Sequence, residues 1–94
     1  MNIDLKGVIK VIFNEVQITD NLSKKEFVVT IDGDSKYPQD ICIQAINTKI
    51  DLLKEYKIGD LVIVKCNLKG KESKSKYYNQ ISLWEIQNKN RGVE

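Results

Sequence analysis

A cluster of lysines followed by aromatic residues is the part of this sequence best suited to bind a ligand. Between Lys65 and Lys76 the chain has five lysines and one acidic residue, a local charge of +4, and Tyr77, Tyr78 and Trp84 follow closely. Lysines attract phosphate groups and aromatic rings stack on nucleobases, so this combination is typical of sites for single-stranded nucleic acid. The whole chain carries a net charge of +2, which leaves −2 for the other residues and concentrates the positive field at this cluster. The candidate nucleic-acid-binding residues are Lys10, Lys24, Lys36, Tyr37, Lys65, Lys69, Lys71, Lys74, Lys76, Tyr77, Tyr78 and Trp84.

Each part of this cluster also has an ordinary structural explanation. A lysine-rich hairpin tip can simply be a solvated loop that discourages aggregation between sheet edges. Tyr37 can either stack on a base or pack against its own turn, and Trp84 can be either a stacking platform or a cap over one end of the core. Strand alternation predicts that Tyr77 points inward and that Tyr78 points outward on the same face as Trp84.

The sequence lacks the residues of common catalytic and metal sites. It contains no histidine, and Cys42 and Cys66 are not in a CxxC pattern, so both a zinc site and the commonest general base are missing. No Ser/Lys, Cys/His or paired-carboxylate arrangement replaces them. We therefore expect a non-catalytic protein without a metal or cofactor, in which both cysteines are buried in the core.

Length and composition predict a single folded domain. The chain has 94 residues, of which 41% are hydrophobic and 30% charged, enough for one simple core. Its first residues lack the features of a signal peptide, and no apolar run reaches the roughly 18 residues of a membrane span. We expect a cytoplasmic protein with one domain over residues 1–87 and a flexible C-terminal tail over residues 88–94.

Period-two alternation of apolar residues predicts two strands in the first third of the chain. The first runs from Ile3 to Phe13, with Gly7 marking a bend. Residues 17–23 are polar and predict a loop, and residues 25–31 resume the alternation in a second strand that should pair with the first as a hairpin. Because Phe13 and Phe27 share the parity of the apolar residues, both are predicted to lie in the core.

The rest of the chain predicts three further strands and one helix. Thr48 and Asp51 resemble a capping box at the start of a short amphipathic helix, under which Tyr56 should pack. A turn at Gly59-Asp60 then ends the connection. The predicted elements are a third strand after Pro38 with Ile41, Ile43 and Ala45 inward, a helix over Lys49 to Tyr56, a fourth strand over about residues 62–69 and a fifth over about residues 76–87.

This order of elements predicts an all-β fold. Five antiparallel strands with one short α-helix between the third and fourth is the element order of the OB-fold, a Greek-key barrel. An SH3-like barrel is the alternative of similar size, but its usual order has no helix at that position. We therefore predict a five-stranded OB-fold barrel, whose closure protects the strand edges.

One pattern of residues runs along nearly the whole chain. It consists of Lys25-Glu26-Phe27-Val28-Val29, Tyr37-Pro38, Ile50-Asp51-Leu52-Leu53, Gly59-Asp60, Val62, Gly70-Lys71-Glu72, Tyr77-Tyr78, Ile81 and Trp84. In order and spacing these residues resemble a family of small bacterial and phage OB-fold domains of unknown function, the DUF3127-type family, which is similar to single-stranded-DNA-binding proteins. The resemblance implies the fold, and it implies function only by analogy. Better-known bacterial single-strand binders recruit other proteins through a long tail, and we do not expect such recruitment through residues 88–94.

Two hypotheses about function follow. The first is a non-catalytic protein that binds single-stranded DNA, or RNA, with little sequence preference in replication, recombination or repair, and that self-associates into a homo-oligomer. The second is a protein-interaction or assembly module that uses the same barrel face or its edge strands, which the low net charge of +2 favours. Neither hypothesis involves a membrane.

Overall fold

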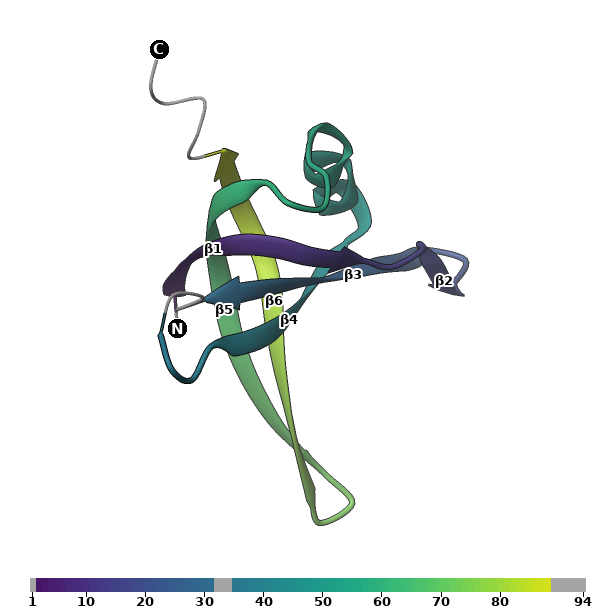
Figure 1. Ribbon diagram of the computed structural model, residues 1–94. Coiled ribbons are helices and arrows are strands. Elements are labelled where there is room, and N and C mark those ends of the chain that lie inside the picture. Colours follow the sequence, from purple (N-terminus) through teal and green to yellow (C-terminus); the bar gives the residue numbers. More distant parts are fainter. Residues whose placement is uncertain (1, 32–34, 89–94) are drawn as a thin grey trace.

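The computed structural model describes residues 2–31 and 35–88, and within them it contains six strands and one short helix. Figure 1 shows these elements in a strongly bent sheet with the helix near one end and a long hairpin projecting from the other. The elements in chain order are β1 (Asn2–Ile12), β2 (Val16–Thr19), β3 (Leu22–Ile31), β4 (Gln39–Ile46), η1 (Asn47–Glu55), β5 (Leu61–Ser73) and β6 (Lys76–Asn88).

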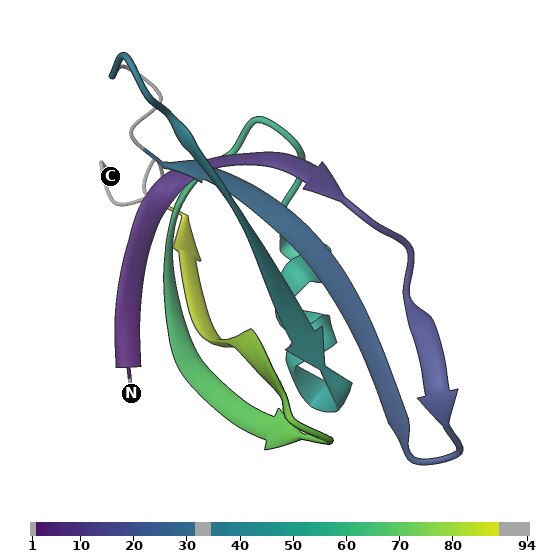
Figure 2. The same ribbon diagram turned by 90° about the horizontal axis from the view of Figure 1, so that it is seen from below.

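Five of the strands close into a barrel. The strand order is β1-β5-β6-β4-β3-β2, and an additional pairing of β1 with β3 completes the ring. Strand β1 curves so strongly that it pairs with β5 through Asn2–Val8 and with β3 through Gly7–Ile12 (Figure 2). Gly7 lies where β1 changes partner, and a Cβ there would overlap the carbonyl oxygen of Thr30. The predicted bend at Gly7, the pairing of the first two long strands and the OB-fold barrel are confirmed.

The interior of the barrel is apolar and draws on every barrel strand and on η1. Ile50 and Leu53 of η1 are buried, so the helix covers one end of the core. The Tyr56 hydroxyl donates a hydrogen bond to the carbonyl oxygen of Ile86 at 3.2 Å, which fixes the ring beneath the helix as predicted. The buried residues are Ile9, Phe27, Val29, Ile43, Ala45, Ile50, Leu53, Val62, Val64, Cys66, Leu83 and Ile86.

The helix differs from the predicted one in type and start. It is a 3-10 helix that begins at Asn47, not an α-helix that begins at Lys49, and no side chain caps its first turn. Asn47 instead has a positive φ of 50°, and its Oδ1 accepts a hydrogen bond from the backbone N–H of Ser23 at 2.9 Å. The start of η1 is therefore fixed by a contact with β3, which a local capping-box pattern cannot reveal.

A bulge in β1 explains why Phe13 is 48% exposed although alternation placed it in the core. The register with β3 shifts between Ile9 and Val11, so that Ile12, and not Val11, lies opposite the buried Phe27. The extra residue reverses the inward parity, and Phe13 points outward. The predicted loop over residues 17–23 is also wrong in part, because it contains the short strand β2 and the start of β3.

The two cysteines have different environments. Cys66 is buried as predicted, and burial followed by the nearby Asp4 carboxylate raises the pKa of its thiol to about 11. The prediction for Cys42 is wrong, because the residue is exposed. It lies between Ile41 and Ile43, whose inward orientation forces Cys42 to the outer face of β4.

A second bulge lies in β6. Lys65 pairs with Glu85 but Cys66 pairs with Leu83, so Trp84 is an extra residue without a partner in the β5–β6 register. Pairing continues to Asn88, which lies opposite Val62, and the rest of the predicted tail, residues 89–94, falls outside the described residues. No helix in the described part of the chain has the length and apolar character that crossing a membrane would require.

The projecting hairpin replaces most of the predicted lysine-rich loop. Lys69 and Lys71 belong to β5, and only Lys74 and Ser75, with φ values of 52° and 67°, form the turn. Positive φ at both central residues is the geometry of a type I′ turn, which matches the twist of the flanking strands. We call the part of this hairpin over residues 69–80 the arm; its strands run beyond the barrel (Figure 1).

Candidate nucleic-acid interface

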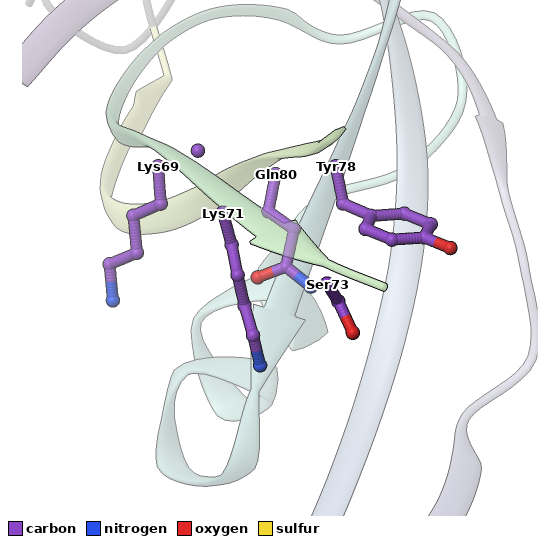
Figure 3. A pocket seen from close by; sticks show the side chains of 6 residues that line it. Lys69, Lys71, Ser73, Tyr78 and Gln80 are labelled. Carbon is purple, nitrogen blue, oxygen red and sulfur yellow. The ribbon is translucent and has the colours of Figure 1, made fainter. Parts of the chain in front are cut away.

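The arm brings two of the predicted lysines and one predicted tyrosine together on one face. Lys71 lies directly opposite Tyr78, and Lys69 lies directly opposite Gln80. Directly opposed residues of an antiparallel pair project from the same side, so this face is fixed by the register alone. Together with Gly70 and Ser73 these residues line an open hollow of about 300 Å³, which we call the arm hollow (Figure 3).

The arm hollow is cationic and has an exposed aromatic ring beside it. Figure 3 shows the side chains of Lys69 and Lys71 extending from β5 in a similar direction, with the ring of Tyr78 to one side. In the described part of the chain neither lysine forms an ion pair, whereas the Lys65 ammonium lies 3.9 Å from the carboxylate of Glu85. Tyr78 is 51% exposed, so part of its ring is accessible to a ligand. The hollow can therefore attract phosphate and offer a stacking surface at the same place.

A second hollow of about 290 Å³ adjoins the first and shares Gln80 with it. It lies between the outer faces of β3 and β4 and the base of the arm, where β6 and β4 are still apart on the N-terminal side of the bridge between Gln44 and Ser82. We call it the floor hollow; its lining residues are Lys24, Glu26, Cys42, Gln44, Asn79, Gln80 and Ile81.

The floor hollow is polar and carries one charge of each sign. Glu26 lies directly opposite Gln44 in the β3–β4 register, and its Oε2 accepts a long hydrogen bond from the Cys42 thiol at 3.6 Å. Gln44 Nε2 donates to the hydroxyl of Ser82 at 3.4 Å. Desolvation of the sulfur, and after it the Glu26 carboxylate, raise the pKa of the Cys42 thiol, although the residue as a whole is exposed. Cys42 therefore stays a neutral thiol at neutral pH.

Trp84 lies on the same outward side of β6 as Tyr78 and Gln80, toward the helix end of the barrel. It is 57% exposed, and the Lys49 ammonium of η1 lies 4.1 Å from the centroid of its ring. This geometry is a cation–π contact at the surface. The alternative that Trp84 caps the core is wrong, because a cap would be buried among apolar side chains.

Other predicted site residues lie apart from the two hollows. The Lys10 ammonium is 2.8 Å from Asp40 Oδ2, and this bond, with a second from the Thr30 hydroxyl at 2.7 Å, lowers the pKa of the Asp40 carboxyl. Lys36 and Tyr37 lie in the connection between β3 and β4, where the Lys36 ammonium is 5.7 Å from the centroid of the Tyr37 ring. The positive charge of Lys10 is therefore balanced within the protein.

The remaining candidates lie on the arm or beside it. Lys76 lies opposite Ser73, on the face of the arm hollow, whereas Lys74 is in the turn. Tyr77 has the parity of the inward residues, as predicted, but it does not reach the core. The arm extends past the barrel and leaves Tyr77 77% exposed, on the face opposite to Tyr78. Lys24 lines the floor hollow.

Several residues of these hollows were not predicted. Once the hairpin turn at Lys74-Ser75 is known, alternation places Ser73 and Gln80 beside the lysines, so that signal was present in the sequence. Glu26, Gln44 and Asn79 had no such signal, because they meet only where β6 passes β4. The described residues include no group of three His, Cys, Asp or Glu side chains placed to hold a metal ion.

Comparison with known proteins supports the architecture. The family profile described as "Domain of unknown function (DUF3127)" matches residues 4–87. No curated protein sequence matches the chain. Among solved structures, the chain is similar to Rim1, a mitochondrial single-stranded DNA binding protein from S. cerevisiae, with a TM-score of 0.77, 18% identity and 95% of each chain covered.

Two bacterial structures show the same similarity of fold. The dimeric N-terminal domain of PriB from Thermoanaerobacter tencongensis gives a TM-score of 0.68 at 12% identity, with 93% of each chain covered. A small single-stranded DNA-binding protein from Streptomyces coelicolor gives a TM-score of 0.60 at 17% identity, covering 98% of this chain and 95% of that one. At these identities the similarity shows the OB-fold and no more.

Proposed function

Since this chain belongs to the DUF3127 family, whose description states no activity, we propose its function from the interface: it is a non-catalytic protein that binds single-stranded nucleic acid along the arm. The observation that carries the proposal is the pairing of Lys71 with Tyr78 in the arm hollow, with Lys69 beside them. DNA replication, recombination or repair is the setting that this activity would serve.

The chemistry of the arm hollow suits an unpaired strand. Lys69 and Lys71 bind successive phosphates, and the exposed face of Tyr78 stacks on a base that no complementary strand holds. The same contacts fit every base, because each has a flat ring and a phosphate, so the arm itself binds with little sequence preference. Rim1 and the small protein from Streptomyces coelicolor, which have a similar fold, are single-stranded DNA-binding proteins, and this supports the proposal at the level of the fold.

Fluorescence anisotropy with a labelled oligonucleotide tests this function. We expect a single strand of about 12 nucleotides, within the usual range of 4–16 per OB-fold, to bind more tightly than the same sequence as a duplex. The duplex offers phosphates but no free base face, so only the electrostatic part of the affinity remains. Equal affinities for the two forms at about 0.15 M salt would contradict a role for base stacking.

We also propose that two copies associate through the open edge of β1. Residues Asn2 to Lys6 pair with β5 on one side, and no strand in the described part of the chain pairs with their other side. An open edge presents unpaired backbone groups that a second copy can satisfy. Sedimentation velocity at micromolar concentration should then give the mass of a dimer, and a monomer at every concentration would contradict the association.

The competing function is protein binding, and one observation favours it. Strand β2 is at the end of the strand order, so one of its edges is open, and Val16 and Ile18 of this strand are exposed, as is Phe13 just before it. An extended segment of a partner could add a strand there and cover these apolar side chains. The anisotropy experiment separates the two functions, because a protein-binding module would bind neither the single strand nor the duplex specifically.

A further inference from the structure

The two hollows differ in charge although they share Gln80. The arm hollow is lined by two lysines and no acidic residue. The floor hollow is lined by Lys24 and Glu26, which together sum to zero, and otherwise by neutral side chains. Phosphates of a bound strand therefore favour the arm hollow, and the floor hollow is left for a neutral group.

The size and position of the floor hollow suit a single base. Its volume of about 290 Å³ is close to the lower end of the range for small-molecule sites, about 300–1,000 Å³. Because Gln80 belongs to both hollows, a nucleotide whose phosphate contacts the arm lysines can place a neighbouring base against β3 and β4. A base that enters there meets side chains and not other bases, so the edge that it would use for base pairing is free to be recognised.

Glu26 determines which bases can bind favourably in the floor hollow through their base-pairing edge. An ionised carboxylate only accepts hydrogen bonds, and in the described part of the chain the side chain of Glu26 accepts one long bond, from the thiol of Cys42. Cytosine presents an exocyclic amino donor at position 4, whereas uracil and thymine present a carbonyl oxygen there, which a carboxylate repels. The side chains of Asn79 and Gln80 make no hydrogen bond with the other described residues and can adapt to the remaining polar atoms of the base.

We propose that the floor hollow is a base-reading subsite in which Glu26 favours bases that carry an exocyclic amino group, and cytosine over uracil or thymine in particular. This proposal rests on the proposed function, since the base arrives as part of a strand bound along the arm. It adds a contact that discriminates between bases to an interface whose other contacts do not.

Oligo(dC) and oligo(dU) of about 12 nucleotides provide the test. These strands differ at position 4 and the adjacent ring nitrogen, and neither carries the methyl group of thymine. Affinities of both strands are measured by anisotropy for the wild type and for Glu26→Gln, which keeps the shape of the side chain but can also donate. We expect the dC:dU affinity ratio to fall about fivefold or more in Glu26→Gln, the lower limit for one good base contact. Differences in stacking between the strands cancel, because both proteins meet the same strands.

The two strands should respond differently to Glu26→Gln. Loss of the carboxylate charge favours both polyanionic strands equally, but only oligo(dU) also loses a repulsive contact at position 4, so its binding should tighten more than that of oligo(dC). Glu26→Ala gives a second measurement and should lower the ratio in the same way. As a matched control, Lys71→Ala should weaken binding of both strands by the same factor and leave the ratio unchanged.

The outcomes separate this inference from the proposed function. If the wild type binds both strands and the dC:dU affinity ratio is the same in the wild type, Glu26→Gln and Glu26→Ala, the proposal of a base-reading subsite is wrong, and the proposal of strand binding stands. If the wild type binds neither strand, the proposed function fails and the subsite fails with it. Melting temperatures of both variants close to that of the wild type ensure that a change in ratio is not caused by unfolding.

Discussion

Replacing Lys69 and Lys71 together with alanine should weaken binding to single strands strongly and leave the fold intact. Both side chains are exposed on the arm, and neither forms an ion pair with another described residue, so their removal costs the free protein little. Both line the arm hollow beside Tyr78, where the strand is proposed to run. The double variant therefore isolates the electrostatic contribution of the arm.

The magnitude follows from counterion release. Each phosphate neutralised on a single strand contributes about −0.7 to the slope of log K against log salt, so losing two contacts makes the slope shallower by about 1.4. Taken alone, this term weakens binding about 25-fold at 0.1 M salt but only about 2.6-fold at 0.5 M salt. The difference between the two proteins should therefore shrink as salt is added.

Anisotropy titrations between about 0.05 and 0.5 M salt measure both slopes. A variant with Lys54 and Lys57 replaced by alanine loses the same net charge from exposed positions that line neither hollow, and its slope should stay close to that of the wild type. Parallel plots for the wild type and the Lys69/Lys71 variant would refute the reasoning, because they would mean that the arm lysines contact no phosphate. A large fall in melting temperature with unchanged binding would instead show that the lysines are structural.

Three further outcomes are expected. Tyr78→Ala should cost roughly 1–3 kcal/mol of strand binding and little stability, whereas Tyr77→Ala, on the opposite face of the arm, should bind like the wild type; equal losses would place the strand elsewhere. Gly7→Ala should destabilise the barrel by several kcal/mol in urea unfolding, because the new Cβ meets a backbone carbonyl of β3 that cannot swing aside; wild-type stability would contradict that overlap. Ser75→Gly should raise the melting temperature by a few degrees, since a non-glycine residue at a φ of 67° costs roughly 1–2 kcal/mol and glycine returns only part of this as unfolded-state entropy; a lower melting temperature would argue against the type I′ turn.

The barrel was predictable because most of its strands alternate strictly. Ile41, Ile43 and Ala45 were assigned to the inner face from parity, and the structure buries Ile43 and Ala45 completely and Ile41 in part. The errors occur where parity breaks. The bulge in β1 turned Phe13 outward, and such a bulge depends on how β1 fits against β3 over a long separation in sequence, which no local pattern records.

One part of the candidate site could be predicted from the sequence and the other could not. The face that holds Lys69, Lys71 and Tyr78 follows from alternation and one hairpin turn, so these residues could be proposed together from the sequence. The floor hollow could not, since Glu26 and Gln80 belong to strands that are not hydrogen-bonded to each other and that both reach this hollow only because β4 lies between them. Residues that tertiary closure brings together have no spacing that a single sequence can show.

Trp84 was predictable in its direction from the sequence but not in its contacts. Its outward direction follows from alternation, but its contact with Lys49 depends on where the tertiary fold places η1 relative to β6. Because the residue is 57% exposed, Trp84→Ala should cost well under the roughly 3–5 kcal/mol of a buried tryptophan. An exposed cation–π contact adds only about 0.5–1 kcal/mol to that cost.

The effect on binding should be larger than the effect on stability. Lys49 covers one face of the ring and places a positive charge beside it, so a base that stacks on the other face has its phosphate close to that charge. Trp84→Ala should then weaken strand binding by roughly 1–3 kcal/mol, and Lys49→Met, which keeps the length of the side chain, should make the salt slope shallower by about 0.7. If Lys49→Met tightens binding instead, Lys49 competes with the base for the ring, and the strand reaches Trp84 only by displacing it. Wild-type affinity in both variants would show that the bound strand does not reach Trp84 and would confine the interface to the arm and the floor hollow.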